Sequence, residues 1–351
     1  MTSLMELKNV SKIFASHGLF QPKSVTVALD DMSLVLEEDF PYIITVAGES
    51  GSGKTTLGML LLGFYTPTMG EVLYNGQNIH ELPRGGMFEF RRDVQAVFQD
   101  PFAVYNPFYK VDNLLSIPIK NFGLASSKAQ AQNMMEQALS NVGLRPEETL
   151  GRYPHQLSGG QRQRIAVARA LLLKPKLLIA DEPVSMVDAS LRATLLKALR
   201  SLNRDFGIPI LYITHDLTTA YHVSDYIVIL YHGSVMEAGN VDAIITDPKH
   251  PYTQLLVGSI PWPDPNRVWG DVQILSKVKG LREETTGCKF APRCPHAFDK
   301  CETARPPLYI IDGIRAASCY LYESDDIITR ENLNTLFPRK EAASRRETVS
   351  Q

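Results

Sequence analysis

The sequence predicts an α/β fold built around a parallel sheet. Three observations predict it: buried apolar runs of strand length, helical patterns between these runs, and a glycine-rich loop that joins one run to a helix. Continuous apolar runs suit parallel strands that are covered on both faces. The runs lie at residues 42–47, 177–180, 210–213 and 226–230. The helical patterns include residues 165–173 and 191–202.

An antiparallel sheet is expected at the beginning of the chain. Val25, Val27 and Leu29 form an alternating run, and a second alternating run follows Asp30–Asp31. Further along, Asn75–Gly76 after the run 71–74 is a strong signal for a two-residue hairpin. These patterns predict a smaller β subdomain beside the parallel sheet.

The chain of 351 residues is long enough for about two domains. Residues 101–156 show helical periodicity without a strong strand, so we expect a helical insert there. After about residue 239 prolines become frequent and all four cysteines appear. We therefore expect a first domain at 1–240, a small second domain at 241–337, and a charged, disordered tail at 338–351.

Composition excludes several classes of protein. Apolar content of 44% and charged content of 21% are typical of a globular protein. The formal net charge of −2 gives no electrostatic argument for binding nucleic acid. The sequence has no run of 18 or more apolar residues, and its beginning does not resemble a signal peptide, so we expect a cytoplasmic chain that does not span a membrane itself.

The most informative motif is the stretch 48–56, which fits the pattern G-x-x-x-x-G-K-[ST] and is called the P-loop below. Its glycines allow successive backbone N–H groups to turn inward around phosphate oxygens. Lys54 is expected to reach the β- and γ-phosphates, and the Thr55 hydroxyl to bind Mg²⁺. A strand before the motif and a helix after it make a chance match improbable. The predicted phosphate-binding residues are Gly48, Ser50, Gly51, Gly53, Lys54, Thr55 and Thr56.

Two acids follow the apolar run at 177–180. A buried strand that ends in carboxylates delivers them to the carboxyl edge of the sheet, where ligands bind in open α/β folds. Asp181 suits coordination of Mg²⁺, and Glu182 is then placed to orient or deprotonate an attacking water. The alternative is an ordinary strand that ends in a polar turn, which Pro183 also favours.

A third motif, Q-L-S-G-G-Q-R-Q-R, lies at residues 156–164. Ser158 is a good N-cap for the helix that follows, and Gly159–Gly160 permit close approach of backbone. This helix N-terminus is a second candidate site for an anion. Capping alone explains Ser158 and the glycines, but not the whole string between a P-loop and an acidic strand end.

With these motifs in this order, residues 4–240 resemble the nucleotide-binding subunits of ATP-binding cassette (ABC) transporters. The resemblance implies a P-loop NTPase (RecA-like) core with an antiparallel β subdomain and a helical subdomain. It also implies roles for residues at matching positions. These are Phe14 for adenine stacking, Gln99 in the Q-loop that also meets Mg²⁺, Ser158 and Gly160 in the signature, Asp181 and Glu182 as magnesium and catalytic acids, Asp188 in the D-loop, and His215 as the switch histidine.

Each of these residues has a simpler alternative. Phe14 is otherwise a core aromatic, His215 a satisfied core histidine, and Gln99 a surface amide. In the D-loop, Met186 and Val187 depart from the family's usual Ala and Leu, while the aspartate is retained.

The later sequence narrows the resemblance to ATPases of oligopeptide/dipeptide importers. Residues 247–256 and 288–295 are similar to segments that follow the cassette in those proteins. The resemblance implies an ATP-hydrolysing subunit, peripheral at the cytoplasmic face of the membrane. Its implied partners are a second ATPase subunit, identical or different, two permease subunits and, indirectly, an extracytoplasmic solute-binding protein.

Other functions remain open or are disfavoured. An oligosaccharide or metal-ion importer stays open, because the cassette does not touch the cargo. A DNA-repair or chromosome ATPase needs a long coiled coil between P-loop and signature, where only about 100 residues lie. A ribosome-acting factor normally carries two cassettes in one chain. Glu182 and His215 disfavour a non-catalytic binding module.

The four cysteines are Cys288, Cys294, Cys301 and Cys319. Clustered cysteines in a cytosolic chain indicate metal ligands before disulfides. Four thiolates suit tetrahedral zinc or a [4Fe–4S] cluster, yet the spacing matches neither the ferredoxin run nor the usual zinc pairs. The family resemblance implies an iron–sulfur cluster in some members. We expect a cluster, with zinc as the alternative and metal-free cysteines or disulfides as the third possibility.

Overall fold

The computed structural model describes residues 3–16, 24–38, 41–99, 105–185, 187, 189–260 and 286–337. Within this part of the chain the strands form two sheets. The larger sheet is parallel at its centre, and the smaller one is antiparallel.

The larger sheet contains nine strands in the described residues, in the order β13-β11-β12-β10-β9-β3-β8-β7-β6. The strands are β3 (Ile43–Ala47), β6 (Val94–Val97), β7 (Leu177–Asp181), β8 (Ile210–Thr214), β9 (Tyr226–Tyr231), β10 (Ser234–Asn240), β11 (Leu308–Ile310), β12 (Arg315–Ala317) and β13 (Ile327–Ile328). The part from β9 to β6 is parallel, and the part from β9 through β10 to β13 is antiparallel. Every residue of β3, β7 and β8 is buried, which confirms the strands predicted from the apolar runs.

The smaller sheet has the order β2-β1-β4-β5. Its strands are β1 (Ser3–Ser16), β2 (Ser24–Glu37), β4 (Met69–Tyr74) and β5 (Gln77–Asn78). Asn75 and Gly76 have φ angles of 50° and 78° and form the predicted hairpin turn. Asp31, at φ 54°, lies inside β2, where the pairing with β1 shifts. The break between the two alternating runs is therefore an irregularity within one strand.

The helices in the described residues form three groups along the chain. The first two helices are α1 (Lys54–Leu61) and α2 (Arg84–Asp93). The middle group is α3 (Val111–Asn121), α4 (Lys128–Asn141), α5 (Pro146–Thr149), α6 (Gly159–Leu171), α7 (Ala189–Phe206) and α8 (Leu217–Val223). The last group is α9 (Val241–Thr246), α10 (Pro251–Gly258) and α11 (Asp299–Thr303). None of these helices is long and apolar enough to cross a membrane.

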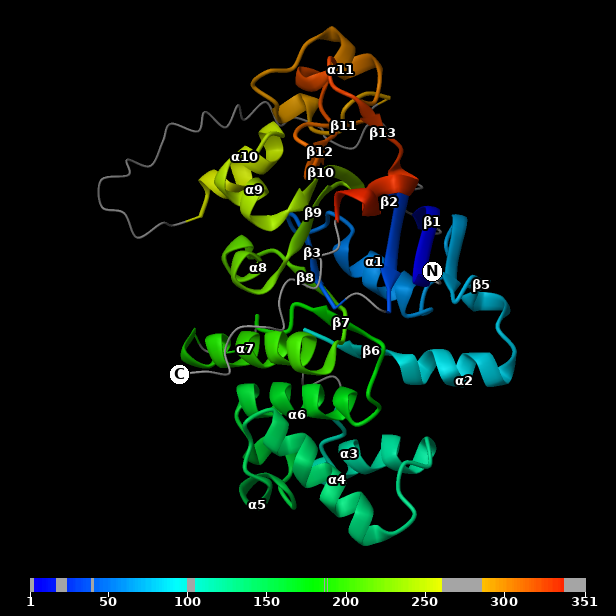
Figure 1. Ribbon diagram of the computed structural model, residues 1–351, viewed down its shortest axis with the longest axis vertical. Helices are drawn as coiled ribbons and strands as arrows, with labels where there is room; N and C mark the ends of the chain where they lie inside the picture. Colours follow the sequence, from blue (N-terminus) through cyan, green and yellow to red (C-terminus); the bar gives the residue numbers. More distant parts are fainter. Residues whose placement is uncertain are drawn as a thin grey trace, which may run out of the picture.

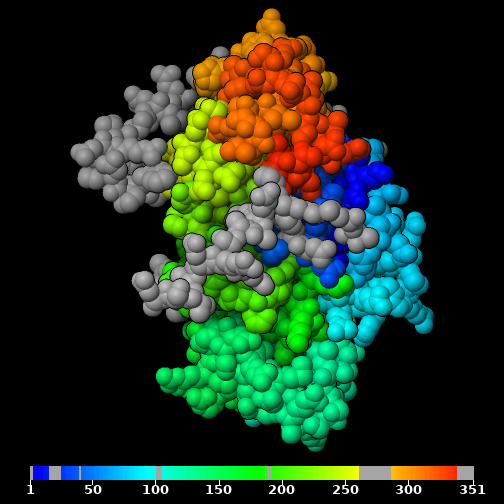
Figure 2. All heavy atoms as spheres, in the orientation of Figure 1, coloured from blue at the N-terminus to red at the C-terminus, as the bar shows by residue number. Residues whose placement is uncertain are grey.

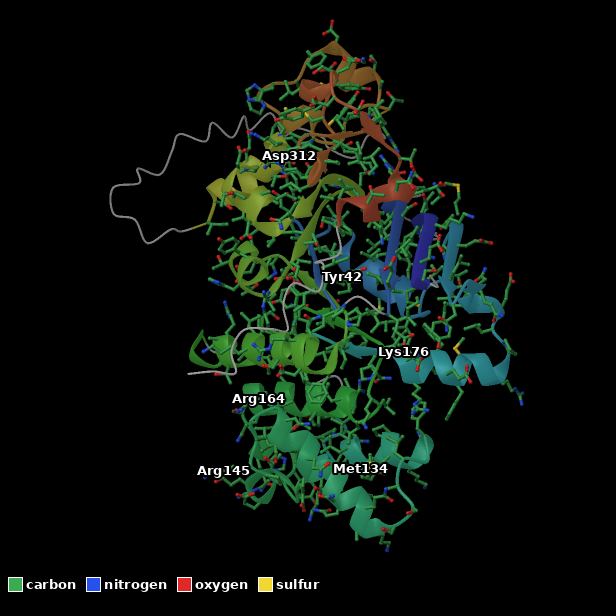
Figure 3. All side chains as sticks on the ribbon, viewed as in Figure 1. Tyr42, Met134, Arg145, Arg164, Lys176 and Asp312 are labelled. Atoms are coloured by element: carbon green, nitrogen blue, oxygen red, sulfur yellow. The ribbon has the colours of Figure 1, made fainter. Side chains whose placement is uncertain are left out.

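Alternating side chains of the central strands enter different cores. Ile44 and Val46 of β3 pack with α1 and the smaller sheet, whereas Ile43 packs with α6 and α7. The described part of the predicted insert, α3 to α5, is helical and packs against α6. Figure 1 shows this helical region at one end of the molecule and β11–β13 with α11 at the other. Arg145 and Asp312 lie near these two ends in Figure 3.

The C-terminal strands continue the sheet of the cassette, so the predicted small separate domain is not confirmed. Ala316 in β12 pairs with Ala238 in β10, and it shares a core with residues of the smaller sheet. The buried guanidinium of Arg315 donates hydrogen bonds to the Ala243 carbonyl, at 2.8 Å, and to the Asp247 carboxylate, at 3.0 Å. Residues 286–337 cap one end of the surface in Figure 2. The predicted tail at 338–351 lies outside the described residues.

Candidate functional site

The P-loop joins β3 to α1 and lies directly against neighbouring backbone. A Cβ atom on Gly48 would lie 2.1 Å from the carbonyl oxygen of Leu230, and one on Gly53 would lie 2.1 Å from that of Ala28. Gly53 also has φ 103°, in the left-handed region. Only glycine fits these two positions, which explains why the motif requires it.

The N-terminus of α1 is open to an anion. Gly53 is its N-cap residue, and no side chain caps the helix. The N–H groups of the first turn have no acceptor within the helix, and the helix dipole adds positive potential there. Ser50, Gly51 and Thr55 are exposed around this turn, and Thr56 is half-buried. The arrangement suits a phosphate group.

Lys54 lies at the centre of the loop with only 6% of its surface exposed. Its ammonium donates hydrogen bonds to the carbonyl oxygens of Gly48 and Glu49, at 2.8 and 2.9 Å. Burial lowers the pKa of Lys54, and the nearby carboxylates of Glu182 and Asp181 oppose that effect. Lys54 is therefore bound by oxygen atoms of the P-loop and lies in the electrostatic field of the two acids at the end of β7.

Asp181 ends β7 and is 8% exposed. Burial raises the pKa of Asp181 to about 6, and the Glu182 carboxylate adds to this, while a hydrogen bond with Thr55 and the Lys54 charge oppose it. The Oδ1 atom of Asp181 is buried without a hydrogen-bond partner among the described residues. An unpartnered buried carboxylate oxygen beside a threonine hydroxyl is a donor set that fits Mg²⁺.

The other two predicted catalytic side chains both contact Glu182. Its Oε1 lies 2.8 Å from Nδ1 of His215, and its Oε2 accepts a hydrogen bond from the Gln99 amide at 2.9 Å. The backbone of Glu182 has φ 46°, which is uncommon for a residue other than glycine and clusters at functional sites. Three segments far apart in sequence therefore meet at one carboxylate.

Phe14 lies on β1 with 38% of its surface exposed. Its ring meets that of Tyr65 edge to face, with centroids 5.5 Å apart. The ammonium of Lys12 lies 5.0 Å from the centroid of Phe14. An exposed ring of this kind is available for stacking, and the simple core alternative does not describe it.

The signature residues cap their own helix. The Ser158 hydroxyl accepts a hydrogen bond from the Gln161 N–H at 3.2 Å, and the Gln161 side chain accepts from the Ser158 N–H at 2.9 Å. Ser158 is exposed, and Gly160 is buried in the first turn of α6. Ser158 and Gly160 contact neither the P-loop nor Glu182 in any hydrogen bond of the described residues. Asp188 lies outside those residues.

The sequence analysis missed the side chains that hold the Q-loop on α6. The buried Gln163 donates a hydrogen bond to the carbonyl oxygen of Phe98 at 3.1 Å, and Arg169 donates to that of Ala96, also at 3.1 Å. Gln99 is therefore fixed relative to the signature helix. The only signal in the sequence is polar residues on an apolar helix face, which does not name their partners.

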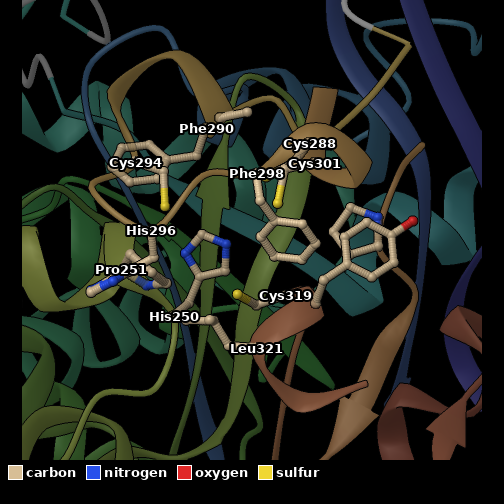
Figure 4. Close-up of a pocket in the computed structure, with 13 residues that line it drawn as sticks. His250, Pro251, Cys288, Phe290, Cys294, His296, Phe298, Cys301, Cys319 and Leu321 are labelled. Atoms are coloured by element: carbon tan, nitrogen blue, oxygen red, sulfur yellow. The ribbon is translucent and has the colours of Figure 1, made fainter. Parts of the chain in front are cut away.

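The four cysteines line one pocket, together with His250 and Phe290 (Figure 4). They form no disulfide. Burial raises the pKa of Cys288 and Cys294, and raises that of Cys319 to about 12. Among the described residues, no three His, Cys, Asp or Glu side chains are close enough together to hold one metal ion. The four cysteines gather as predicted, and a bound metal is not confirmed by the described residues.

Replacement of Asp181 by asparagine tests the electrostatics of the site. Folding raises the pKa of Asp181 from 3.8 to about 6, so its carboxyl favours the folded state most below pH 3.8 and loses that contribution as the pH rises through 6. At pH 8, Asp181→Asn should raise the free energy of unfolding of the ligand-free protein by about 3 kcal/mol. The gain should be about 1.4 kcal/mol smaller at pH 5. Urea unfolding at both pH values measures it, and an equal gain at both would contradict the assignment.

Comparisons with known proteins agree with this geometry. A family described as "ABC transporter" matches residues 29–185, and one described as "Oligopeptide/dipeptide transporter, C-terminal region" matches residues 236–301. A dimeric, post-hydrolysis structure of an ATP-binding cassette bound to ADP and Pi is similar, with a TM-score of 0.60 and 28% identity. That similarity covers 68% of this chain and 98% of the other.

Two relatives extend over nearly the whole chain. The "Probable peptide ABC transporter ATP-binding protein" of Sinorhizobium fredii is 37% identical over 91% of this chain and 90% of its own length. The dipeptide transport ATP-binding protein DppF of Escherichia coli is 36% identical over 88% of this chain and 91% of its own length. The chain therefore belongs to the ATP-binding subunits of ABC transporters, in the group that carries the oligopeptide/dipeptide transporter C-terminal region.

Proposed function

We propose that this chain hydrolyses ATP to drive the import of oligopeptides or dipeptides through membrane permease subunits. The observation that carries the proposal is the meeting of Gln99 and His215 on Glu182, beside the P-loop. The C-terminal match and the peptide and dipeptide transport named for the relatives support the class of cargo. We assign the ATP-binding unit to residues 1–240 and regard residues 241–337 as the extension of the peptide-importer group.

The P-loop binds the phosphates in this proposal. The open N-terminus of α1 and the nest of backbone N–H groups receive the phosphate oxygens, and Lys54 pairs with the β- and γ-phosphates. Thr55, Asp181 and Gln99 would hold Mg²⁺, which would neutralise charge on the phosphates. Phe14 stacks on the adenine. The unpartnered Oδ1 of Asp181 supports this set of magnesium ligands.

Glu182 is the general base for the attacking water. Its carboxylate holds a position fixed by His215 on one side and Gln99 on the other. The base accepts a proton from water as the oxygen attacks the γ-phosphate, and His215 orients the same reacting groups. In-line attack then releases ADP and phosphate.

Two ATPase chains enclose the nucleotides between them. Ser158 is exposed at the N-terminus of α6, and among the described residues neither it nor Gly160 forms a hydrogen bond with the P-loop or Glu182. We therefore assign both to the ATP bound by a partner ATPase subunit. Asp188 belongs to the same interface. The partner is either a second copy or a related chain.

Movement of the helical region transmits the closure of the site on ATP to the permease subunits in the membrane. Gln99 contacts Glu182, and the preceding residue is bound by Gln163 of α6. Closure on ATP shifts this connected unit, which is the two-state element that a switch requires. We place the subunit at the cytoplasmic face of the membrane, with two permease subunits and an extracytoplasmic solute-binding protein that delivers the cargo.

Glu182→Gln tests the catalytic assignment. The amide keeps the shape of the side chain and loses the proton acceptor, so the rate of ATP hydrolysis should fall by roughly 100-fold or more. Mg·ATP should still bind, and the ATP-bound dimer should persist. Steady-state hydrolysis and size-exclusion chromatography with ATP measure the two effects.

Ser158→Arg provides the complementary variant. It should leave ATP binding to the monomer unchanged and abolish the ATP-induced dimer, because the bulky side chain faces the partner's phosphates.

Hydrolysis by Glu182→Gln at the normal rate would exclude Glu182 as the base. Dimerisation of Ser158→Arg with loss of monomer binding would reverse the assignment of the signature.

We further propose that Cys288, Cys294, Cys301 and Cys319 hold a [4Fe–4S] cluster. One zinc ion needs its four sulfurs about 3.8 Å apart, since each Zn–S bond is about 2.3 Å long. In a cubic cluster each thiolate binds a different iron, so the sulfurs stand farther apart around a larger site. Four cysteines that line one pocket and form no disulfide supply enough thiolates for such a cluster. The cluster would supply folding energy to this region.

Iron analysis of protein purified without oxygen tests the cluster. We expect a brown protein with broad absorption near ~400 nm and about four irons per chain. Cys294→Ser should abolish the colour and increase hydrogen exchange in residues 286–337, with ATP binding measured alongside. A colourless preparation with one zinc per chain would exclude the cluster and keep a metal site. Absence of any metal from a folded C-terminal region would exclude both.

A further inference from the structure

Residues of the C-terminal region contact the P-loop at Glu49. The guanidinium of Arg293 donates hydrogen bonds to both carboxylate oxygens of Glu49, at 2.9 and 3.0 Å. The hydroxyl of Tyr252 accepts a hydrogen bond from the backbone N–H of Glu49 at 2.9 Å. The second residue of the P-loop is therefore fixed through its side chain and its backbone by residues beyond the proposed ATP-binding unit.

Aromatic rings confine Arg293 in this position. Its guanidinium carbon lies 5.6 Å from the ring centroid of Phe290 and 5.7 Å from that of Tyr231. The rings of Tyr231 and Tyr252 pack together with centroids 4.6 Å apart. A bidentate pair between confined side chains loses less entropy when it forms than an exposed ion pair between flexible ones.

A second route reaches the P-loop at Ser52, three residues after Glu49. The ammonium of Lys289 donates to the His232 carbonyl oxygen at 2.6 Å, and it pairs with the Asp30 carboxylate at 2.7 Å. Gly233, which follows His232 in the chain, donates its N–H to the carbonyl oxygen of Ser52 at 2.9 Å. Lys289 and Arg293 both lie between Cys288 and Cys294, so one short loop acts on the P-loop along two routes.

We propose that Arg293 is a positioning residue for the P-loop and that it neutralises Glu49 beside the bound phosphates. The proposal rests on ATP binding at the P-loop. An unpaired Glu49 carboxylate would repel the phosphates of ATP, because its charge is near enough to Lys54 to influence that ammonium. A loop held at Glu49 and at Ser52 also keeps its N–H groups oriented before ATP arrives, and preorganised donors bind more tightly than mobile ones. The C-terminal region thus sets the ATP affinity of the cassette.

The test is the Kd for Mg·ATP of the full-length chain, measured for the wild type and for Arg293→Met. We expect the Kd to rise on the order of 10-fold. The kcat at saturating ATP should stay within about twofold, because Glu182 and His215 are untouched. Arg293→Lys should recover part of the affinity. Arg145→Met is the matched control, because it removes an exposed Arg–Glu ion pair in the helical region. Figure 3 shows Arg145 far from Asp312, which marks the C-terminal region, so this variant should leave the Kd unchanged.

Two further variants separate positioning from charge, and the second of them leaves Arg293 in place. The double variant Glu49→Gln/Arg293→Met lacks the negative charge of the Glu49 carboxylate. Its Kd should therefore lie closer to the wild-type value than the Kd of Arg293→Met alone. Tyr252→Phe removes one hydroxyl and should raise the Kd by about twofold or more. The proposal would be overturned if Arg293→Met and Tyr252→Phe both had the wild-type Kd for Mg·ATP. It would also be overturned if the Kd of the double variant were as high as that of Arg293→Met alone. A wild-type chain that does not bind ATP would overturn the proposed function itself, and this proposal with it.

Discussion

The buried ammonium of Lys54 is the charge around which the rest of the site is arranged. At 6% exposure it has almost no water, so protein atoms must stabilise it. The carbonyl oxygens of Gly48 and Glu49 do so, and the carboxylates of Asp181 and Glu182 add charge of the opposite sign. A phosphate at the open end of α1 would pair with the same ammonium. The site is therefore shaped to receive an anion.

The register of the parallel strands brings these groups together. Asp181 at the end of β7 is paired with Ile213 of β8, and Ala47 at the end of β3 is paired with Thr214. The P-loop, Glu182 and His215 each follow one of these aligned ends. Parallel strands end at the same edge of a sheet. The three segments that follow these strands therefore meet there because of the strand pairing alone. The C-terminal strands extend this sheet at its other side, and their loops reach back to Glu49.

Local patterns were sufficient to predict the parts of the site that one segment encodes. The P-loop, the acids after β7, the Ser158 cap and the central strands all lie in runs of fewer than ten residues, and each run has its own signal. The contacts between segments gave no such signal. Glu49 and Arg293 are 244 residues apart, and Gln163 and the Phe98 carbonyl are 65 residues apart. The three-residue strand β12 is too short to show a period, so its pairing with β10 could not be predicted.

Binding of Mg·ATP to the wild-type chain and to Lys54→Met tests the central role of this lysine most directly. Methionine retains much of the length and apolar volume of the lysine side chain and removes the ammonium. The account predicts that the wild type binds one ATP per chain and that Lys54→Met binds on the order of 100-fold more weakly, because a charge-assisted contact with the phosphates is lost. Equal Kd values for the two proteins would contradict it.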